Sequence, residues 1–370
     1  PGATLLIGDN AQGKTNLLEA LYYLATTRSP HASQDNQLIN WEASQSSDPL
    51  SASRLVADLA SSGPPKQVEM RLILERRENN QVSFRREALV NKRKVRLMDL
   101  IGQMQVVLFL PEDVALVTGP PSERRRYLDI TLCQVNRQYC RTLSQYNKVL
   151  EQRNVLLRQM AEGQGNQDVL EILTDKLVEI GRQIFAVRAG FFSAIENDFE
   201  RIHFEELTEG QESLHIDYLP RLQSKTNGST GKEMLDDSQW LMAHLDDVEA
   251  IGQRFSEALK ASQSRDIQRG STSIGPHRDD WRFLINGRNL GSYGSRGQQR
   301  SAILALKMTQ INWMTELTGE SPILLLDEVL AELDESRRRQ LLRYVQNAEQ
   351  AILTATDPGM FSKEFLDAST

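Results

Sequence analysis

Cysteine, aromatic residues and long apolar runs are all scarce in this 370-residue chain. Its two cysteines, Cys133 and Cys140, lie seven residues apart on what the pattern predicts to be one helix. Two helical turns would separate them by ~10 Å, which is too far for a disulfide. A chain of this length buries enough surface to be stable without such a bond. We therefore expect a reducing, intracellular setting.

The sequence also lacks a membrane-spanning segment and a secretory signal. Its longest aliphatic or aromatic runs, at 106–110 and 323–326, are far shorter than the ~20 apolar residues of a transmembrane helix. No charged segment or cleavage-like segment precedes the apolar residues 5–7. We expect a cytoplasmic protein with no membrane partner.

A positive net charge is missing too, because 43 Lys and Arg face 50 Asp and Glu, a formal net charge of −7. This excludes a globally basic nucleic-acid coat protein, but it does not exclude a local basic face. Residues 71–101 hold nine bases against four acids, and residues 122–158 hold eight against three. Residues 195–260 hold fifteen acids and six bases. The acidity is therefore concentrated in one segment, while two others are each net +5.

The hydrophobic pattern at the start of the chain is that of an α/β protein. The apolar run 4–7 is typical of a buried parallel strand, and residues 17–24 continue at helical spacing. Segments 68–74 and 82–90 alternate like antiparallel strands. Between them and the first helix, residues 29–66 are rich in Ser, Ala, Gln and Asp. We interpret this stretch as a variable, partly mobile surface segment.

Long helical periodicities replace this pattern in the middle of the chain. Helices are expected at 124–160, 169–199 and 246–262, with an irregular stretch at 203–240. Strand signals return at 281–285, 323–326 and 351–354. This order predicts an α/β domain split by an inserted, mostly helical lobe. The predicted boundaries are 1–111 and 266–370 for the two parts of the split domain and 112–265 for the lobe.

A glycine-rich loop joins the first expected strand to the first helix. Residues 8–15 fit the pattern G-x-x-x-x-G-K-[ST], in which backbone N–H groups at a helix N-terminus cradle a phosphate. Lys14 would neutralise the β- and γ-phosphates of ATP, and the Thr15 hydroxyl would ligate Mg²⁺. The alternative is a glycine turn that only caps the helix. The predicted ATP-binding residues are Gly8, Asp9, Asn10, Ala11, Gln12, Gly13, Lys14, Thr15 and Asn16.

Two carboxylates follow the apolar run 323–326. A buried parallel strand would deliver Asp327 and Glu328 to its carboxyl end, where open α/β sheets bind nucleotides. Asp327 would hold the Mg²⁺ ion, and Glu328 would polarise the attacking water. By itself this pattern is also that of a capped strand end. Together with the phosphate loop it favours catalysis, with Glu328 and Lys14 as the catalytic residues.

A third motif opens the apolar helix that precedes this strand. Its residues, 32 positions before Asp327, are Ser295, Arg296, Gly297 and Gln298. Ser-x-Gly-Gln is the form of the ABC-type signature, whose hydroxyl, N–H groups and helix N-terminus grip a γ-phosphate in trans. The alternative is a helix cap made by Ser295 and Gln298. After the last strand, Thr356 and Asp357 are candidates for the γ-phosphate switch, a position where such ATPases usually carry His.

Taken together, these blocks resemble the RecF family, DNA replication and repair proteins related to the ATPase heads of SMC proteins. The blocks lie in the family's order and span nearly the whole chain. They are residues 8–20 (GDNAQGKTNLLEA), 109–126 (FLPEDVALVTGPPSERRR), 275–280 (GPHRDD), 295–300 (SRGQQR) and 324–334 (LLLDEVLAELD). The blocks 109–126 and 275–280 are specific to RecF, and His277 in the latter is a further candidate near a dimer face.

The resemblance implies an ABC-type P-loop ATPase domain split by a helical lobe. It implies slow hydrolysis of ATP·Mg²⁺, an ATP-dependent homodimer, and binding to junctions between single- and double-stranded DNA. The implied partners are RecR and RecO, which would work with this protein in loading RecA, and RecA itself. The implied location is the cytoplasm, in association with the nucleoid. The family also has a further strand before the phosphate loop with residues near the adenine, so base contacts are not assigned here. Residues 29–66 are longer than the family pattern.

Basic segments are candidates for contacts with DNA phosphates. The alternative for each is a solvated face with internal ion pairs, and Arg124–126 could also lie near the nucleotide or brace the lobe. The candidates are Arg76, Arg77, Arg85, Arg86, Lys92, Arg93, Lys94, Arg124, Arg125 and Arg126. No recognition-helix or RNA-binding motif occurs, which predicts binding without sequence preference.

Two other functions fit part of the pattern. A transport-coupled ABC subunit would be a compact domain without a long helical insert, usually with a His switch. An SMC-like head would need hundreds of residues of heptads between its two parts, and this chain has none.

Overall fold

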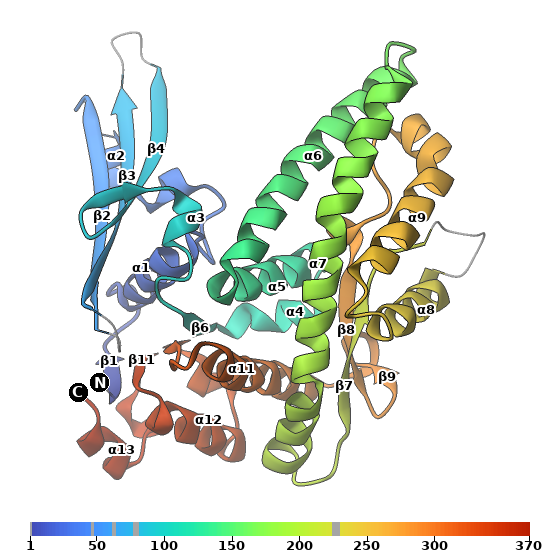
Figure 1. The fold of residues 1–370 in the computed structure, drawn as a ribbon. Helices are drawn as coiled ribbons and strands as arrows, with labels where there is room; N and C mark the ends of the chain where they lie inside the picture. The colour runs from blue at the N-terminus through green and yellow to red at the C-terminus, as the bar shows by residue number, and fades with distance from the viewer. Residues whose placement is uncertain (1, 46–47, 61–63, 77–80, 224–229) are drawn as a thin grey trace. The chain divides into compact units, whose positions relative to one another are not determined.

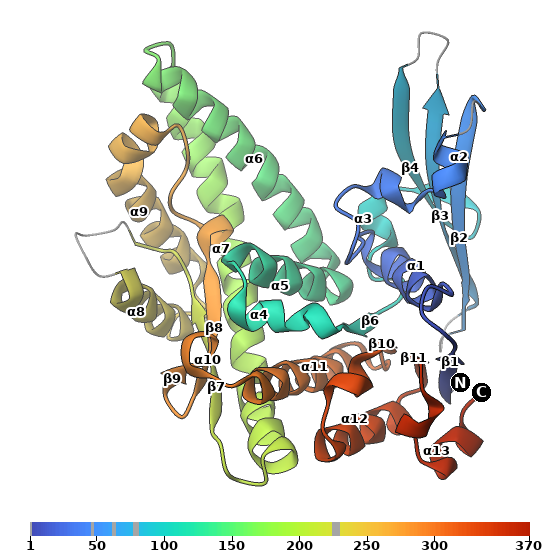
Figure 2. The ribbon, with the colours of Figure 1, turned by 180° about the vertical axis from the view of Figure 1, so that it is seen from behind.

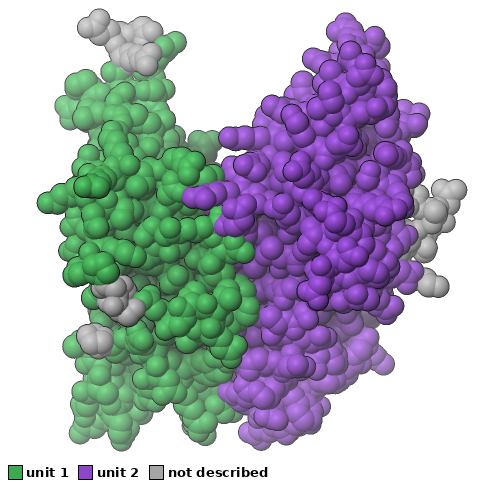
Figure 3. All heavy atoms as spheres, in the orientation of Figure 1, with its two compact units in different colours: residues 1–112, 133–137, 310–370 green, residues 113–132, 138–309 purple. Residues whose placement is uncertain are grey.

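The computed structural model describes residues 2–45, 48–60, 64–76, 81–223 and 230–370. The chain divides into two compact units, which Figure 3 shows in different colours. Unit 1 comprises residues 1–112, 133–137 and 310–370, and unit 2 comprises residues 113–132 and 138–309. The domain boundaries drawn from the sequence at 112 and 265 stay a prediction.

A four-stranded parallel sheet forms the centre of unit 1 (Figure 1). Its strands, in spatial order, are β1 (Gly2–Ile7), β11 (Gln350–Ala355), β10 (Ile323–Asp327) and β6 (Val106–Phe109). Strands were predicted from the sequence at 4–7, 323–326 and 351–354, and the apolar residues of β6 and β10 are almost completely buried. Helix α1 (Lys14–Thr26) packs on this sheet through Leu18 and Leu24. Unit 1 also contains the helices α3 (Leu97–Leu100), α12 (Glu335–Asn347) and α13 (Lys363–Ala368).

A second sheet in unit 1 is antiparallel. Its strands, in order, are β2 (Leu50–Leu59), β3 (Lys66–Arg76), β4 (Val82–Val90) and β5 (Arg93–Val95). Alternation in β3 places Val68, Met70, Leu72 and Leu74 in the core on one face, as expected for a half-buried sheet. The prediction of strands at 68–74 and 82–90 is confirmed, with Leu72 opposite Arg86.

The interpretation of residues 29–66 as a variable surface segment is wrong for residues 50–59. They form β2, which pairs with β3 along its whole length. The sequence did not predict this strand because small, polar residues such as Ser51 and Ser53 lie on its more buried face. They weaken the alternation of apolar and polar residues by which a strand is recognised. Before it, residues 35–38 form a 3-10 turn, and α2 (Trp41–Gln45) forms a single helical turn.

Unit 2 is built mainly of helices (Figures 1 and 2). They are α4 (Ala115–Thr118), α5 (Pro121–Val135), α6 (Arg137–Ala161), α7 (Gln167–Arg201), α8 (Thr230–Met242), α9 (Val248–Arg269) and α10 (Leu290–Tyr293). Helix α11 (Arg296–Thr318) begins in this unit, and its residues from Gln310 onward belong to unit 1. A three-stranded antiparallel sheet completes the unit, with β7 (Leu214–Leu219), β8 (Asp280–Ile285) and β9 (Arg288–Asn289).

Two predictions in this region are wrong. The single helix expected at 124–160 is interrupted at Asn136, so Cys133 lies on α5 and Cys140 on α6. The stretch 203–240, expected to be irregular, contains β7, whose partner β8 begins 66 residues after the start of β7. Such long-range pairing leaves no local signal beyond a short alternation.

Within the described residues, none of the helices combines the length and the apolar character needed to cross a membrane. In the same part of the chain, no group of three or more His, Cys, Asp or Glu side chains is arranged to hold a metal ion.

Candidate nucleotide site

The phosphate loop lies between β1 and α1, as its motif predicts. Gly13 is the N-cap of α1 and has φ 85°, a left-handed conformation that glycine adopts without strain. Ala11 also has a positive φ, 63°, which is unfavourable for a residue with a Cβ. Residues 9–13 and Asn16 are exposed, whereas Gly8, Lys14 and Thr15 are partly buried. The loop therefore has a strained backbone with its N–H-rich segment open to solvent.

Lys14 turns back over this loop. Its ammonium donates to the carbonyl oxygens of Gly8 at 2.6 Å and Asp9 at 3.0 Å. It also lies 3.4 Å from a carboxylate oxygen of Glu328, whose side chain is 40% exposed, while that of Lys14 is 10% exposed. The cation is thus surrounded by oxygen atoms at the position where the motif requires it to meet phosphate oxygens.

The acidic end of β10 meets the start of α1. The Thr15 hydroxyl donates to Asp327 Oδ1 at 3.1 Å, and Asp327 is only 7% exposed. Glu328 follows with φ 50°, a conformation that costs a non-glycine residue on the order of 1–3 kcal/mol and is found mostly at functional sites. The structure therefore brings together all four residues predicted to hold Mg²⁺ or to catalyse, namely Lys14, Thr15, Asp327 and Glu328. Their roles remain predictions.

Thr354 is a member of this cluster that the sequence did not reveal. Its buried hydroxyl donates to Asp327 Oδ1 at 2.6 Å and accepts the N–H of Glu328 at 3.0 Å. The parallel register places Thr354 of β11 directly beside Asp327 of β10. The two switch candidates lie just past this strand and are exposed, and Asp357 accepts the N–H of Gly359 at 2.8 Å. Thr356 and Asp357 stay predictions, whereas Thr354 has direct contact with the acidic residues.

The Ser295–Gln298 motif lies in unit 2, at the start of α11. Ser295 N–H donates to Gln298 Oε1 at 2.8 Å, and Gln298 N–H donates to Ser295 Oγ at 3.2 Å, which is a reciprocal cap. The Gln298 amide also donates to Glu212 at 2.7 Å. Arg296 and Gly297 are exposed. The helix-cap interpretation is therefore correct as a description of the contacts, and the helix N-terminus is open to solvent.

The GPHRDD block lies in unit 2, where Gly275, Pro276 and Asp279 are buried, His277 and Asp280 are partly buried and Arg278 is exposed. Asp279 is 1% exposed and accepts from Arg188 Nη1 at 2.9 Å, Tyr218 Oη at 2.5 Å and the Arg221 N–H at 2.9 Å. Burial raises the pKa of Asp279 to about 6, and Arg188 opposes this shift. Both ring nitrogens of His277 are also bonded internally, to Tyr146 Oη at 2.8 Å and to the Thr272 carbonyl at 3.1 Å. These contacts favour a structural role for the block.

The arginines of 124–126 join the same region. Arg124 is 9% exposed and uses its guanidinium on Asp280, at 2.6 and 3.0 Å, and on the Gly119 carbonyl at 2.8 Å. Arg125 donates to the Asp279 carbonyl at 2.6 Å, and burial lowers its pKa. Arg126, the third arginine of this run, is not without a partner either. For Arg124 and Arg125 the geometry favours the interpretation that they brace the lobe.

Most basic candidates of the antiparallel sheet are paired within unit 1. Arg85 contacts Glu75 and Glu87, Lys94 contacts Glu87 at 2.8 Å, and Arg86 contacts Asp35 at 2.6 Å. Arg76 donates to the Ser44 carbonyl. Lys92 is exposed in the turn between β4 and β5, Arg93 is exposed at the start of β5, and Arg77 lies outside the described residues. Because exposed ion pairs are weak, these pairs do not prevent contacts with phosphates.

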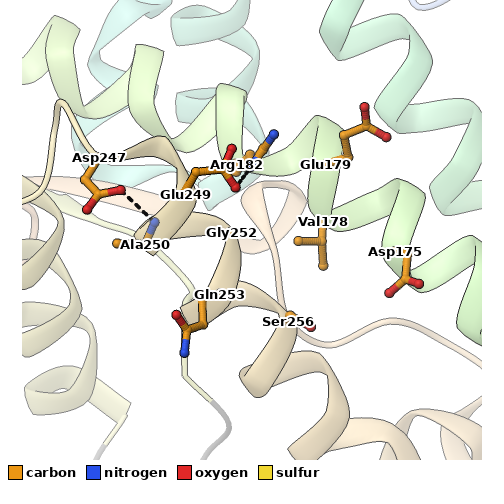
Figure 4. Close-up of a pocket in the computed structure, with 10 residues that line it drawn as sticks. All are labelled: Asp175, Val178, Glu179, Arg182, Asp247, Glu249, Ala250, Gly252, Gln253 and Ser256. Carbon is orange, nitrogen blue, oxygen red and sulfur yellow. Dashed lines mark hydrogen bonds and ion pairs between the residues drawn. The ribbon is translucent and has the colours of Figure 1, made fainter.

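A cavity of about 590 Å³ lies in unit 2 between α7 and α9 (Figure 4). Four carboxylates line it, those of Asp175, Glu179, Asp247 and Glu249. Arg182 pairs with Glu249, and Asp247 accepts the Ala250 N–H at 2.9 Å. The remaining negative charge would repel phosphates, so this cavity is not a nucleotide site.

The strand, loop and helix around Lys14, together with the acidic end of β10, define a P-loop nucleotide-binding protein. A family model described as the RecF/RecN/SMC N terminal domain matches residues 1–368. The DNA replication and repair protein RecF of Chloroflexus aurantiacus is 40% identical over 375 residues, which cover 100% of this chain and 91% of that protein. RecF of Ligilactobacillus salivarius is 38% identical, covering 97% of this chain and 86% of that protein.

A solved structure gives the same result. The recombination mediator protein RecF with ATP, of the RecFOR pathway, has 30% sequence identity and a TM-score of 0.79. The match covers 98% of this chain and 87% of that one. This chain belongs to the RecF family. The resemblance of its sequence blocks and the predicted fold class, a P-loop ATPase domain with an inserted helical lobe, are thereby confirmed.

Proposed function

We propose that this chain is a DNA-binding ATPase that dimerises on ATP and binds gapped DNA or junctions between single- and double-stranded DNA. It would help to load RecA in DNA repair, and slow hydrolysis of ATP would reset it. The observation that carries this proposal is the hydrogen-bonded cluster of Lys14, Thr15, Asp327 and Glu328. This cluster joins a phosphate-binding loop to an acidic strand end, which is the arrangement that ATP hydrolysis requires.

Each residue of the cluster has a chemical task in this proposal. Lys14 would exchange the carbonyl oxygens of Gly8 and Asp9 for the β- and γ-phosphate oxygens of ATP. Thr15 and Asp327 would ligate Mg²⁺, which neutralises charge on the phosphates. Glu328 would orient the attacking water and accept its proton, and its backbone is held for this by the hydroxyl of Thr354.

The N-terminus of α11 supports a second half of the site, in trans. Ser295 Oγ accepts the Gln298 N–H, so the hydroxyl still has its own proton to donate to a phosphate oxygen. The cap and the signature are therefore compatible. Ser295 and the N–H groups of α11 would bind the γ-phosphate of an ATP molecule held by a second copy of the chain. Such a shared ligand would couple ATP binding to dimerisation.

The partners are inferred from the relatives. Those at about 40% identity are DNA replication and repair proteins, and the solved structures are of a recombination mediator in the RecFOR pathway. On this basis we infer RecR, RecO and RecA as partners and DNA bound without sequence recognition. A protein with these partners would work in the cytoplasm at the nucleoid.

Gel filtration with light scattering, with and without ATP and Mg²⁺, tests the composite site. We expect the wild-type chain to dimerise with ATP, and Lys14→Ala and Ser295→Ala to stay monomeric. Lys260→Ala, an exposed residue of α9, is the matched control and should behave as wild type. Dimerisation that persists in both site variants would exclude the composite site. Binding to a tailed duplex that ATP does not enhance would exclude the ATP-gated mechanism.

A further inference from the structure

Glu328 has a backbone conformation that its surroundings must hold in place. Its φ is 50°, in the left-handed region, and a residue with a Cβ stays there only where neighbouring groups fix it. On its N-terminal side, the hydroxyl of Thr354 accepts the Glu328 N–H at 3.0 Å. On its C-terminal side, the chain forms a 3-10 turn, Val329–Glu332, before α12 begins at Glu335 (Figure 1). The contacts of this turn therefore help to keep Glu328 where it is.

The backbone hydrogen bonds of the turn are long. The Ala331 N–H donates to the Glu328 carbonyl at 3.3 Å, and the Leu333 N–H donates to the Leu330 carbonyl at 3.3 Å. Backbone hydrogen bonds are most often about 2.9–3.0 Å long, so these two contribute little rigidity. Leu330 and Leu333 are buried, which anchors their side chains, but the carbonyl oxygens at the end of a helical turn need a further donor.

Arg338, near the N-terminus of α12, supplies that donor. Its Nε donates to the Leu330 carbonyl at 3.2 Å, and its Nη2 donates to the Leu333 carbonyl at 3.1 Å. One planar guanidinium thus bridges two carbonyls of the same segment, and Arg338 is partly buried. Its backbone N–H donates to the carbonyl of Asp334, the N-cap of α12, at 2.9 Å. The segment that follows Glu328 is therefore tied to the start of α12.

The two arginines beside Arg338 make different contacts. Arg337 pairs with Asp334, and Arg339 pairs with Glu335 at 3.0 Å. The side chains of the second pair are 63% and 87% exposed, so this pair contributes little to stability. Neither pair includes a residue of the turn at 329–332. Arg339 therefore provides a control one position away from Arg338.

We propose that Arg338 is a positioning residue for ATP hydrolysis, which holds the segment after Glu328 so that this carboxylate stays at the phosphate loop. A carboxylate oxygen of Glu328 lies 3.4 Å from the ammonium of Lys14 in that loop. A general base must lie within hydrogen-bonding reach of the proton that it accepts, so its backbone position affects the rate directly. The proposal rests on the proposed function, because it needs Glu328 to act on water. Arg338 acts through Glu328 and not on the nucleotide.

Separate measurements of ATP turnover and of the affinity for a non-hydrolysable ATP analogue test this role. Arg338→Met removes both donors, whereas Arg338→Lys keeps the charge without the planar fork. A displacement of about 1 Å can cost on the order of 100-fold in rate, so we expect Arg338→Met to lower kcat by about 10- to 100-fold. The affinity for the analogue should stay within about twofold of wild type. Arg338→Lys should recover part of kcat, and Arg339→Met should behave as wild type.

A double substitution shows whether Arg338 acts through Glu328. In single-turnover measurements with radiolabelled ATP, Glu328→Gln should slow hydrolysis, and Arg338→Met added to it should slow it by less than about twofold more, since residues that act as a unit are not additive. A merely structural role would lower the rate in this background by the same factor as in the wild type, or weaken binding of the analogue as much as it lowers kcat. If Arg338→Met does not fold, Arg338→Gln, which keeps a single donor group, replaces it in both comparisons.

Either sign of a merely structural role would overturn the inference, and so would a kcat of Arg338→Met within about twofold of wild type. A wild-type protein that does not hydrolyse ATP would instead refute the proposed function, and this inference with it. The two failures are distinguishable, because only the second abolishes turnover before any residue is changed.

Discussion

Replacement of Arg188 by leucine removes the central cation of unit 2. Arg188 lies on α7 and is 1% exposed. Its guanidinium donates to Asp129 at 2.8 Å, Asp279 at 2.9 Å, Tyr139 Oη at 3.0 Å and the Pro276 carbonyl at 2.6 Å. These partners come from α5, α6 and the GPHRDD block, so a single side chain links three segments of the chain.

The expected loss of stability follows from the buried charge that has no partner once leucine replaces Arg188. A buried ion pair contributes little net stability, but removal of one partner costs about 3–5 kcal/mol because the other charge stays buried without compensation. Here that charge is Asp279, which would keep only its bonds from Tyr218 and the Arg221 N–H. The free energy of unfolding of an ordinary domain is about 5–15 kcal/mol. We therefore expect Arg188→Leu to lose a large fraction of the stability of unit 2.

The loss should depend on pH. The folded-state pKa of Asp279 is about 6, raised above its unfolded value of 3.8. The stability linked to this proton is therefore present below pH 3.8 and is lost as the pH rises through 6. Without Arg188, the pKa of Asp279 in the folded state rises further. The stability of the variant therefore continues to fall at higher pH, by about 1.4 kcal/mol per pH unit. The difference between wild type and Arg188→Leu should thus be larger at pH 8 than at pH 5.5.

Urea unfolding followed by circular dichroism at these two pH values measures both effects. Arg182→Leu is the matched control, because Arg182 is on the same helix but is paired at the surface with Glu249, whose side chain is 83% exposed. Exposed pairs contribute about 0–1 kcal/mol, so this variant should be close to wild type. A loss below about 1 kcal/mol in Arg188→Leu, or one that is equal at both pH values, would contradict the reasoning.

Two further variants test unit 1. Thr354→Val keeps the shape of the side chain but leaves the Glu328 N–H without its acceptor, so we expect a loss of about 1–3 kcal/mol in urea unfolding and slower ATP turnover; an unchanged turnover would show that this contact does not position Glu328. Hydrogen bonds from Arg54 and Arg71 lower the pKa of Glu69 to about 2, so its contribution is present above pH 4.5 and is lost as the pH falls through 2. Glu69→Gln should cost about 1 kcal/mol at pH 7, less than a fully buried pair because Arg54 is exposed, and unfolding measurements at pH 7 and 3 should show the difference shrinking.

The candidate site was predictable where its residues are consecutive. The phosphate loop is a local motif of eight residues, and the Asp327–Glu328 pair ends a single apolar strand. Both could therefore be found without knowledge of their neighbours. Thr354 could not, because its position beside Asp327 depends on the register of two strands 27 residues apart. No property of the sequence around Thr354 distinguishes its hydroxyl from that of Thr356.

The errors in the fold have the same origin. Residues 50–59 and 214–219 are held as strands by their pairing, edge to edge, with β3 and β8, respectively. Their own composition is polar or mixed, and tertiary pairing overrides such weak local preferences. The helix expected at 169–199 was predicted well, because its period of 3.6 residues repeats over many turns. It is observed as α7, at Gln167–Arg201.

The GPHRDD block shows how a motif noticed by resemblance can have a structural role. Gly275 has φ 128°, and a Cβ there would lie 2.5 Å from Tyr146 Oη, so both its backbone and its space require glycine. The Thr272 carbonyl can only accept, so His277 Nε2 donates to it and Nδ1 accepts from the Tyr146 hydroxyl. Burial keeps this ring neutral by lowering the pKa of His277 to about 3. With both nitrogens occupied, His277 has no lone pair or proton to offer a substrate. The GPHRDD block therefore links segments of unit 2 through its own hydrogen bonds.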